Sequence, residues 1–176
     1  MKAVLFREHG GPEKLSYEEM PRPQIGPQEV LIRVKACALN HLDIWVRQGS
    51  PAYPIPLPHV LGSDVAGVVE EVGGQVEGVK AWDRVLVSPG ISCWNCEFCL
   101  AGRDNMCRTY HLLGAKIHGG YAEYVKVPFR NVLPIPEHIP FEQAAAFPLV
   151  SVTAAHLLFA LAGLQLGETV LVMGGG

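Results

Sequence analysis

Residues 93–107 read CWNCEFCLAGRDNMC and place four cysteines at C-x2-C-x2-C-x7-C spacing. Polar residues and a glycine separate the cysteines, which indicates a loop of tight turns. Four thiolates that such turns bring together can form a closed tetrahedral site, and an all-sulfur site suits Zn²⁺. Because protein ligands would fill every position, we predict a structural zinc held by Cys93, Cys96, Cys99 and Cys107.

Two other uses of the four cysteines stay open. A pair of disulfides would need an oxidising compartment, and the N-terminal stretch MKAVLFREHG has too short an apolar run for a secretory signal. An iron–sulfur cluster also takes four thiolates. We favour zinc over both, since two-residue spacers are typical of closed zinc sites.

Composition excludes several function classes. The chain has 176 residues with a net charge of -3 and no basic run, so it has no electrostatic footprint for nucleic acid. Its 19 glycines and 14 prolines make up a larger share of the chain than the roughly 12% that these two residue types contribute to an average protein. This excess favours short strands joined by turns. The uncharged stretch 144–164 lacks basic flanks and aromatic belts, so we interpret it as a buried helix and not a membrane span. We expect a cytoplasmic protein.

Strands punctuated by turns occupy most of the chain. Short apolar segments bounded by glycine or proline predict strands over residues 3–6, 30–38, 64–72, 84–87 and 121–127. The pattern then changes to helical spacing over 142–164, and a short apolar strand over 169–173 leads into three glycines at 174–176. A strand followed by a glycine turn is how a dinucleotide-binding βαβ unit begins.

The cysteine loop resembles the structural-zinc lobe of the medium-chain dehydrogenases/reductases, the superfamily of zinc-type alcohol dehydrogenases and quinone oxidoreductases. Residues 62–73 (GSDVAGVVEEVG) look like the G-H-E-x2-G-x5-G signature of its zinc-containing members. Residues 119–124 (GGYAEY) are similar to the strand that follows the lobe. Residues 37–43 (CALNHLD), with VRQG shortly after them, look most like the quinone-oxidoreductase branch.

The resemblance implies a mainly β fold with some α structure. It predicts a GroES-like, partly open β-barrel, followed by a linker helix and the first strand of a truncated Rossmann domain. The substrate domain would cover residues 1–140, with the zinc lobe at 90–110, and the second piece would cover 141–176. The same resemblance implies NAD or NADP as cofactor of the full-length enzyme, a small-molecule substrate, no nucleic-acid or membrane partner, and a homodimer or homotetramer.

Alcohol dehydrogenases of this superfamily hold a second, catalytic zinc on Cys, His and Cys, with one open position. By resemblance Cys37 stands at the first position, but Ser63 replaces the histidine and Leu149 falls near the third. The chemistry would allow other ligands near Cys37 in sequence: His41, Asp43 and His59. We interpret Cys37 as a buried, small apolar residue at a strand end, which leaves structural zinc only.

Without a catalytic zinc, hydride transfer to a carbonyl needs hydrogen-bond donors at the oxygen that gains charge. We predict that Asn40, His41, Tyr53 and Thr153 carry this role. By resemblance, Tyr53 lies at the rim of the substrate cleft, and Asn40 and Thr153 contact the nicotinamide. Each of three residues also has an ordinary structural interpretation. Asn40 could form an Asx turn, the Thr153 hydroxyl could bond to its own helix turn, and Tyr53 could be an exposed loop residue.

One further pair stands out on a short predicted helix. Asp43 and Arg47 lie one turn apart, so we predict an ion pair between them that stabilises the helix by about 0.3–0.5 kcal/mol.

The predicted function is the substrate-binding part of an NAD(P)H-dependent oxidoreductase with structural zinc only. It would transfer hydride to or from a small carbonyl, enone or alcohol. Gly174 and Gly176 would begin the cofactor-binding turn, whose helix the 176 residues do not include, so we expect the chain alone to be inactive. Two alternatives stay open: a zinc-stabilised binding module without catalysis, and an alcohol dehydrogenase with a catalytic zinc at Cys37.

Overall fold

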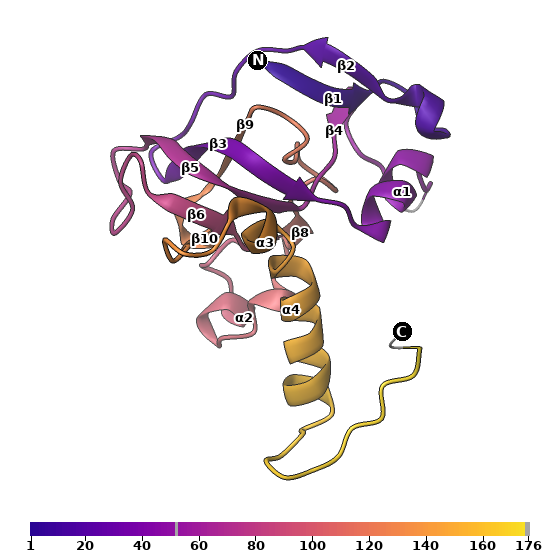
Figure 1. Cartoon of the computed structure of the whole chain (residues 1–176), viewed down its shortest axis with the longest axis vertical. Helices are drawn as coiled ribbons and strands as arrows, with labels where there is room; N and C mark the ends of the chain where they lie inside the picture. Colours follow the sequence, from indigo (N-terminus) through magenta and orange to yellow (C-terminus); the bar gives the residue numbers. More distant parts are fainter. Residues whose placement is uncertain (52, 175–176) are drawn as a thin grey trace.

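A computed structural model describes residues 1–51 and 53–174 of the chain. Antiparallel strands form the body, and a helix leads away from it toward the C-terminus (Figure 1). The strands belong to a five-stranded, a three-stranded and a two-stranded sheet. Among the described residues, we find no helix that is long and apolar enough to cross a membrane.

The five-stranded sheet forms the central layer. It contains β3 (Glu29–Ala38), β5 (Asp64–Val72), β6 (Arg84–Val87), β9 (Tyr124–Pro128) and β10 (Val132–Pro134), in the order β10–β6–β5–β3–β9. The register pairs Val30 with Val127 and Ile32 with Val125, and all four side chains are buried in the main hydrophobic cluster. β-Branched residues at alternate positions thus place one face of the sheet on the core.

The three-stranded sheet closes one side of this core. It consists of β1 (Lys2–Phe6), β2 (Ser16–Glu19) and β4 (His59–Val60), in the order β2–β1–β4, and the 3₁₀ turn η1 (Pro12–Lys14) joins β1 to β2. Residues 121–123 connect it to β9, because the Tyr121 carbonyl accepts the Val4 N–H at 2.7 Å and the Glu123 N–H donates to the Lys2 carbonyl. The predicted strand over 121–127 therefore starts only at Tyr124, where pairing with β3 begins.

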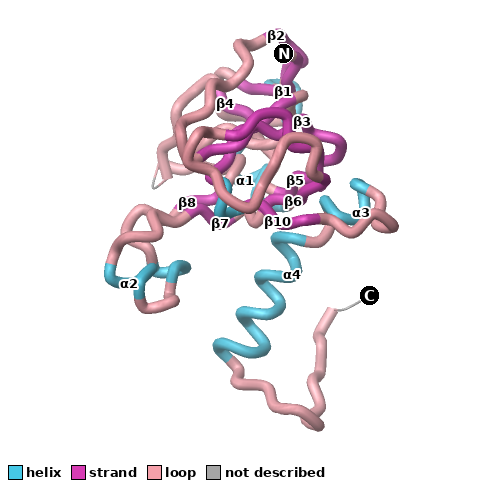
Figure 2. The backbone as a smooth tube through the Cα atoms, turned by 90° about the vertical axis from the view of Figure 1, so that its left-hand side faces the viewer, coloured by secondary structure: helices cyan, strands magenta, loops and turns pink. Residues whose placement is uncertain are grey.

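A lobe over residues 92–110 projects from the sheets (Figure 2). It is held between β7 (Gly90–Ile91) and β8 (His111–Leu112), which pair with each other. The lobe contains α2 (Glu97–Leu100) and the 3₁₀ turn η2 (Asp104–Met106). Asn131, in the 3₁₀ turn η3 (Phe129–Asn131), donates to the carbonyls of Ser88 and Gly90 and so fixes the base of the lobe.

Helices connect and flank the sheets. α1 (His41–Gln48) follows β3, and α3 (Phe141–Ala145) packs against β3 and β5. Ala144 and Ala145 of α3 are buried with Ala66 and Ile135.

The single helix predicted over 142–164 is wrong in two respects. It is interrupted between α3 and α4 (Pro148–Ala155), and α4 continues as a π-helix, η4 (His156–Leu161). Pro148 has no N–H to donate to the preceding turn, so α3 does not continue through it and a new helix begins there, while Phe147 itself keeps helical backbone angles. The predicted burial also fails, because Val150 and Phe159 are 57% and 63% exposed, and α4 points away from the sheets (Figures 1 and 2).

The strand predicted over residues 169–173 does not form. The segment has no strand partner among the described residues, and Leu171 and Met173 are exposed. A single strand leaves its backbone groups unpaired and is not stable without a neighbour. Strands over 64–72 and 84–87 have the predicted bounds. The division into two domains stays a prediction.

Candidate functional site

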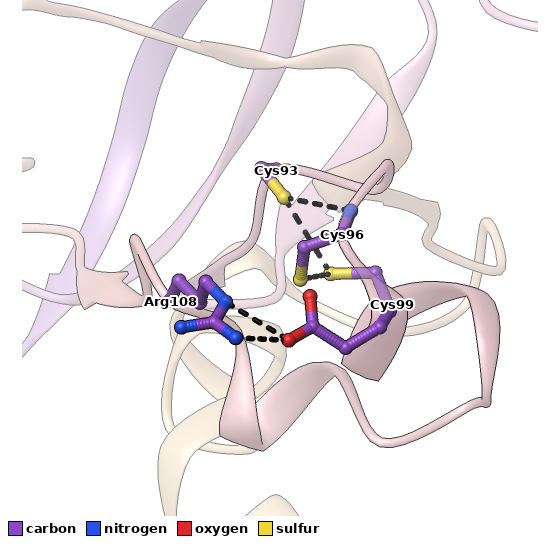
Figure 3. A network of polar contacts seen from close by, with 5 residues as sticks. Cys93, Cys96, Cys99 and Arg108 are labelled. Carbon is purple, nitrogen blue, oxygen red and sulfur yellow. Dashed lines mark hydrogen bonds and ion pairs between the residues drawn. The ribbon is translucent and has the colours of Figure 1, made fainter.

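The four cysteines of the lobe converge, as predicted. Their Sγ atoms lie within 4.8 Å of one another, with Cys96 at 3.6 Å and Cys93 at 3.9 Å from the Cys99 sulfur (Figure 3). All are free thiols, so the disulfide alternative is wrong in this structure. Tetrahedral coordination with Zn–S bonds of about 2.3 Å places sulfurs ~3.8 Å apart. The cluster is therefore compatible with a single structural zinc ion.

Backbone N–H groups donate hydrogen bonds to two of these sulfurs, and at Cys107 this favours the thiolate form. The Cys93 N–H donates to the Cys107 sulfur at 3.3 Å, and the Cys96 N–H donates to the Cys93 sulfur at 3.3 Å. The first of these bonds lowers the pKa of Cys107 to about 6, because N–H donors stabilise the charged form. A cluster of several iron and sulfide atoms would need wider sulfur spacing than one ion, so the geometry favours zinc over an iron–sulfur cluster.

An ion pair braces the outside of the lobe. Arg108 donates two hydrogen bonds to the carboxylate of Glu97, in the first turn of α2, and the Nε bond measures 2.9 Å (Figure 3). Both side chains are exposed, and such pairs contribute little on their own. Here the pair joins α2 to the residue that follows Cys107.

A second polar network surrounds Asp43 at the start of α1. The buried carboxylate accepts the Asn40 N–H at 2.8 Å, the Tyr121 hydroxyl at 2.7 Å and the Gly62 N–H at 3.2 Å. Burial and this carboxylate together raise the pKa of Tyr121, which keeps its hydroxyl protonated as a donor. The predicted Asp43–Arg47 ion pair is wrong, because Arg47 donates to the carbonyl of Gly10 instead.

Asp64 extends the network to α4. Its carboxylate accepts the side-chain amide of Asn40 at 3.0 Å and the backbone N–H of Leu149 at 2.9 Å. The residue is 1% exposed, and burial raises its pKa above the ordinary value. One carboxylate thus joins β5, the residue before α1 and the first turn of α4, where an anion meets free N–H groups.

The predicted catalytic residues occupy different environments. Asn40 belongs to the network, and the exposed His41 ring packs on Trp45 with centroids 4.8 Å apart. Tyr53 is half-exposed and lines a cavity of about 310 Å³ beside α1. The Thr153 hydroxyl donates to the Leu149 carbonyl at 2.7 Å, which matches the helix-hydroxyl alternative.

Of the two predicted cofactor-binding glycines, the structure describes one. Gly174 is exposed with a left-handed φ of 70°, and Gly176 lies outside the described residues. Their role stays a prediction.

Cys37 is enclosed by glycines and an aromatic ring. A Cβ at Gly62, where φ is 98°, would lie 2.7 Å from the Cys37 sulfur and 2.6 Å from the Tyr121 ring. Burial raises the pKa of the Cys37 thiol to about 12. Across the described chain, the lobe cysteines form the one group of three or more potential metal ligands. His59 lies elsewhere, with Nε2 3.1 Å from the Gly114 carbonyl.

Comparison with known proteins now fixes the family. The profile of the alcohol dehydrogenase GroES-like domain matches residues 26–137, which include most of the barrel and the whole cysteine lobe. The chain belongs to this alcohol dehydrogenase family. The predicted GroES-like fold and the resemblance to the medium-chain superfamily are confirmed.

Two curated relatives show the range of the family. The chain is 36% identical over 182 residues to an NAD-dependent alcohol dehydrogenase of Sulfolobus acidocaldarius, covering 100% of this chain and 52% of that protein. It is 37% identical over 164 residues to an L-threonine 3-dehydrogenase of Mesorhizobium japonicum, covering 90% and 46%. The chain therefore spans about half the length of these relatives.

Solved structures agree with this assignment. A crystal structure of an NAD-dependent alcohol dehydrogenase superposes with a TM-score of 0.91 at 50% identity, over 96% of this chain and 49% of that one. A cobalt- and zinc-bound thermostable alcohol dehydrogenase from Pyrobaculum aerophilum gives 0.83 at 39% identity, over 91% and 48%. The named relatives are alcohol and threonine dehydrogenases, so the quinone-oxidoreductase branch stays a prediction.

In this member of the alcohol dehydrogenase family, two residues of the polar network were not predicted from the sequence. Tyr121 and Asp64 belong to segments that resemble the family, but neither was predicted as a site residue. A sequence signal existed for Asp64, since a carboxylate at the start of an apolar strand must be buried and partnered. No comparable signal marked Tyr121.

Proposed function

We propose that the chain is the substrate-binding part of an NAD(P)-dependent oxidoreductase of the alcohol dehydrogenase type, with one structural zinc. The enzyme would transfer hydride to or from a small alcohol, carbonyl or enone. The observation that carries the proposal is the convergence of four thiol sulfurs within 4.8 Å in a chain of this family.

The zinc would be held by Cys93, Cys96, Cys99 and Cys107. When bound, it supplies a cross-link between the turns of the lobe and no catalytic chemistry, since four thiolates close its coordination sphere. Two backbone N–H groups hold the sulfurs of Cys93 and Cys107 in place. Hydrogen bonds of this kind orient the metal ligands and reduce the negative charge on sulfur.

Structural zinc alone is the assignment that the ligand geometry favours. Cys37 has a strongly raised pKa, and the carboxylates of Asp43 and Asp64 already accept hydrogen bonds from protein donors. Ser63, at the position of the signature histidine, offers a hydroxyl, which is a poor zinc ligand.

Asn40 and His41 would handle the substrate oxygen. One N–H of the Asn40 side chain donates to Asp64, which fixes the amide and leaves its second N–H available. The His41 ring rests on Trp45, which lines the cavity beside α1. Donors that are held in place before the reaction stabilise oxygen charge without reorganisation.

The nicotinamide cofactor, when bound, supplies or accepts the hydride. In the described part of the chain, no glycine turn leads directly into the N-terminus of an α-helix, the arrangement that binds pyrophosphate.

Metal analysis of the purified chain tests the proposal. Plasma mass spectrometry should find one zinc per chain, none in Cys96→Ser, and one in the matched control Cys37→Ser. Two zinc ions, one of them lost in Cys37→Ser, would support the catalytic-zinc alternative. An unchanged zinc content in Cys96→Ser would contradict the four-thiolate site.

A further inference from the structure

A cavity of about 540 Å³ lies apart from the cysteine lobe and the Asp43 network. It opens between β9, at the edge of the central sheet, and the three-stranded sheet, with the loop over residues 116–119 on one side. Its volume falls in the range of sites that enclose small ligands.

The inner wall of this cavity is apolar. Val60, Ile91 and Val125 are buried beneath it, and Met1 and Met20 add flexible side chains at the N-terminal side. Unbranched methionines adapt their shape to apolar ligands. The wall thus suits a flexible hydrocarbon tail more than a polar molecule.

The charged residues around the cavity are mostly basic. Lys116 and Lys126 line it, and Glu29 is the one acidic residue among its described lining residues. His118 also lines it, but burial lowers its pKa and its Nδ1 accepts the Val60 N–H, so its ring is neutral. The Lys126 ammonium is 3.0 Å from the Glu29 carboxylate. Lys116 makes no ion pair within the described chain, and its ammonium lies 5.8 Å from the centre of the Tyr53 ring. Lys116 therefore gives this opening a cationic group that no carboxylate of the described chain neutralises, in a protein whose net charge is -3.

We propose that this cavity binds an amphiphilic carboxylate, namely a medium-chain fatty acid or an acyl chain that ends in a carboxylate. The hydrocarbon tail lies against Val60 and Val125, and the carboxylate meets Lys116 and Lys126 at the rim. Apolar burial provides affinity, and the ammonium groups select the anionic head. None of the described lining residues is a cysteine of the lobe, Asn40, His41 or Tyr53, although Lys116 lies beside the Tyr53 ring.

NMR titration of the ¹⁵N-labelled chain with decanoate, below its micelle concentration, tests the proposal. Saturable shifts should appear at Gly119, Ala122 and Lys126. Octanoate should bind about fifteenfold more weakly, since each buried methylene contributes about fourfold. Decanol and decyltrimethylammonium, which share the tail, should bind at least about tenfold more weakly than decanoate.

Charge variants separate the head-group contacts from unspecific hydrophobic binding. Lys116→Gln combined with Lys126→Gln should weaken decanoate binding about tenfold and leave decanol unchanged. Glu29→Gln removes the negative charge beside Lys126 and should tighten the binding of decanoate. Lys35→Gln changes an exposed lysine outside the cavity, and should have no effect.

Three outcomes would overturn the proposal. These are equal affinity for the cationic amphiphile, shifts confined to the cavity beside Tyr53, and binding to phosphatidylglycerol vesicles without binding of free decanoate. The double variant should keep the melting temperature of the parent chain, because the side chains of both lysines are exposed. Zinc content reports separately on the proposed function.

Discussion

The hydroxyl of Tyr121 donates a 2.7 Å hydrogen bond to Oδ2 of Asp43, which lies 78 positions earlier in the chain. The same carboxylate accepts N–H groups from Asn40 and Gly62. One buried anion thus joins the first turn of α1, the loop before β5 and the segment before β9. Removal of one donor leaves the charge buried with fewer partners, which is costly.

Tyr121→Phe should therefore destabilise the fold by about 1.5–3 kcal/mol, the range for hydrogen bonds to charged groups. Urea denaturation followed by circular dichroism measures the free energy of unfolding. Tyr17→Phe is the matched control, because Tyr17 is 69% exposed and its ring packs only near the Lys2 ammonium. Equal stability of the two variants would contradict a structural role for the Tyr121–Asp43 bond.

Gly62→Ala should cost about 1–3 kcal/mol or more, because overpacking adds to the strain of a left-handed backbone. The new Cβ would lie under 3 Å from both the Tyr121 ring and the Cys37 sulfur. Thermal unfolding by calorimetry checks this loss. Gly74→Ala, where no atom lies within 4 Å of an added Cβ, should be nearly neutral. Addition of Cys37→Ala to Gly62→Ala should recover part of the stability if the clash with sulfur is real.

The stability of the barrel should fall as pH decreases below about 6.5. Burial lowers the pKa of His59, and the nearby rings of His118 and His9 lower it further. The unfolded chain then takes up a proton before the folded chain does, so acid favours unfolding. One titrating group changes the free energy of unfolding by at most about 1.4 kcal/mol per pH unit.

Denaturant titrations between pH 7.5 and pH 5 measure this dependence. His59→Gln should reduce the slope, because glutamine can still donate to the Gly114 carbonyl but does not titrate. His138→Gln removes an exposed histidine and should leave the slope unchanged. A slope that both variants retain would place the responsible proton on another group.

Zinc removal should unfold the lobe locally. Treatment with a chelator is expected to raise hydrogen exchange over residues 92–110 and to leave amides of the β3–β5 pair protected, because the lobe has its own short elements outside the sheets. Mass spectrometry of exchanged peptides resolves the two regions. Exchange that increases equally in both would show that the metal supports the whole barrel, contrary to this expectation.

Strand positions were predictable where a short apolar segment is bounded by turn residues. Residues 64–72 and 84–87 carry the pattern of β5 and β6 in their own side chains. The segment over 169–173 is as apolar as a strand, yet it has no partner among the described residues and stays irregular. Strand pairing is a property of two segments, so one of them cannot predict it alone.

The helix over 142–164 shows the same limit for burial. Its apolar residues predicted a buried helix, whereas Val150 and Phe159 are exposed on α4 and η4. Periodicity reports which residues would share a face, but the packing of a neighbour decides whether that face is covered. The break at Pro148 was not predicted, although the covalent geometry of proline favours the first position of a helix.

The four-cysteine site was determined by the sequence itself. Its sulfurs come from one stretch of 15 residues, and the N–H groups that hold them belong to Cys93 and Cys96, within the same turns. Short spacers restrict the backbone enough to bring the sulfurs together. Local chain geometry is therefore sufficient for this part of the protein.

Only the tertiary structure decided the partners of Asp43 and Asp64. In sequence, Asp43 has Arg47 one helical turn away, but its carboxylate faces Tyr121 and Gly62 in the folded chain. Asp64 accepts the N–H of Leu149, 85 residues further along. A buried carboxylate pairs with the donors that folding leaves unsatisfied around it, and the identity of those donors depends on how distant segments pack.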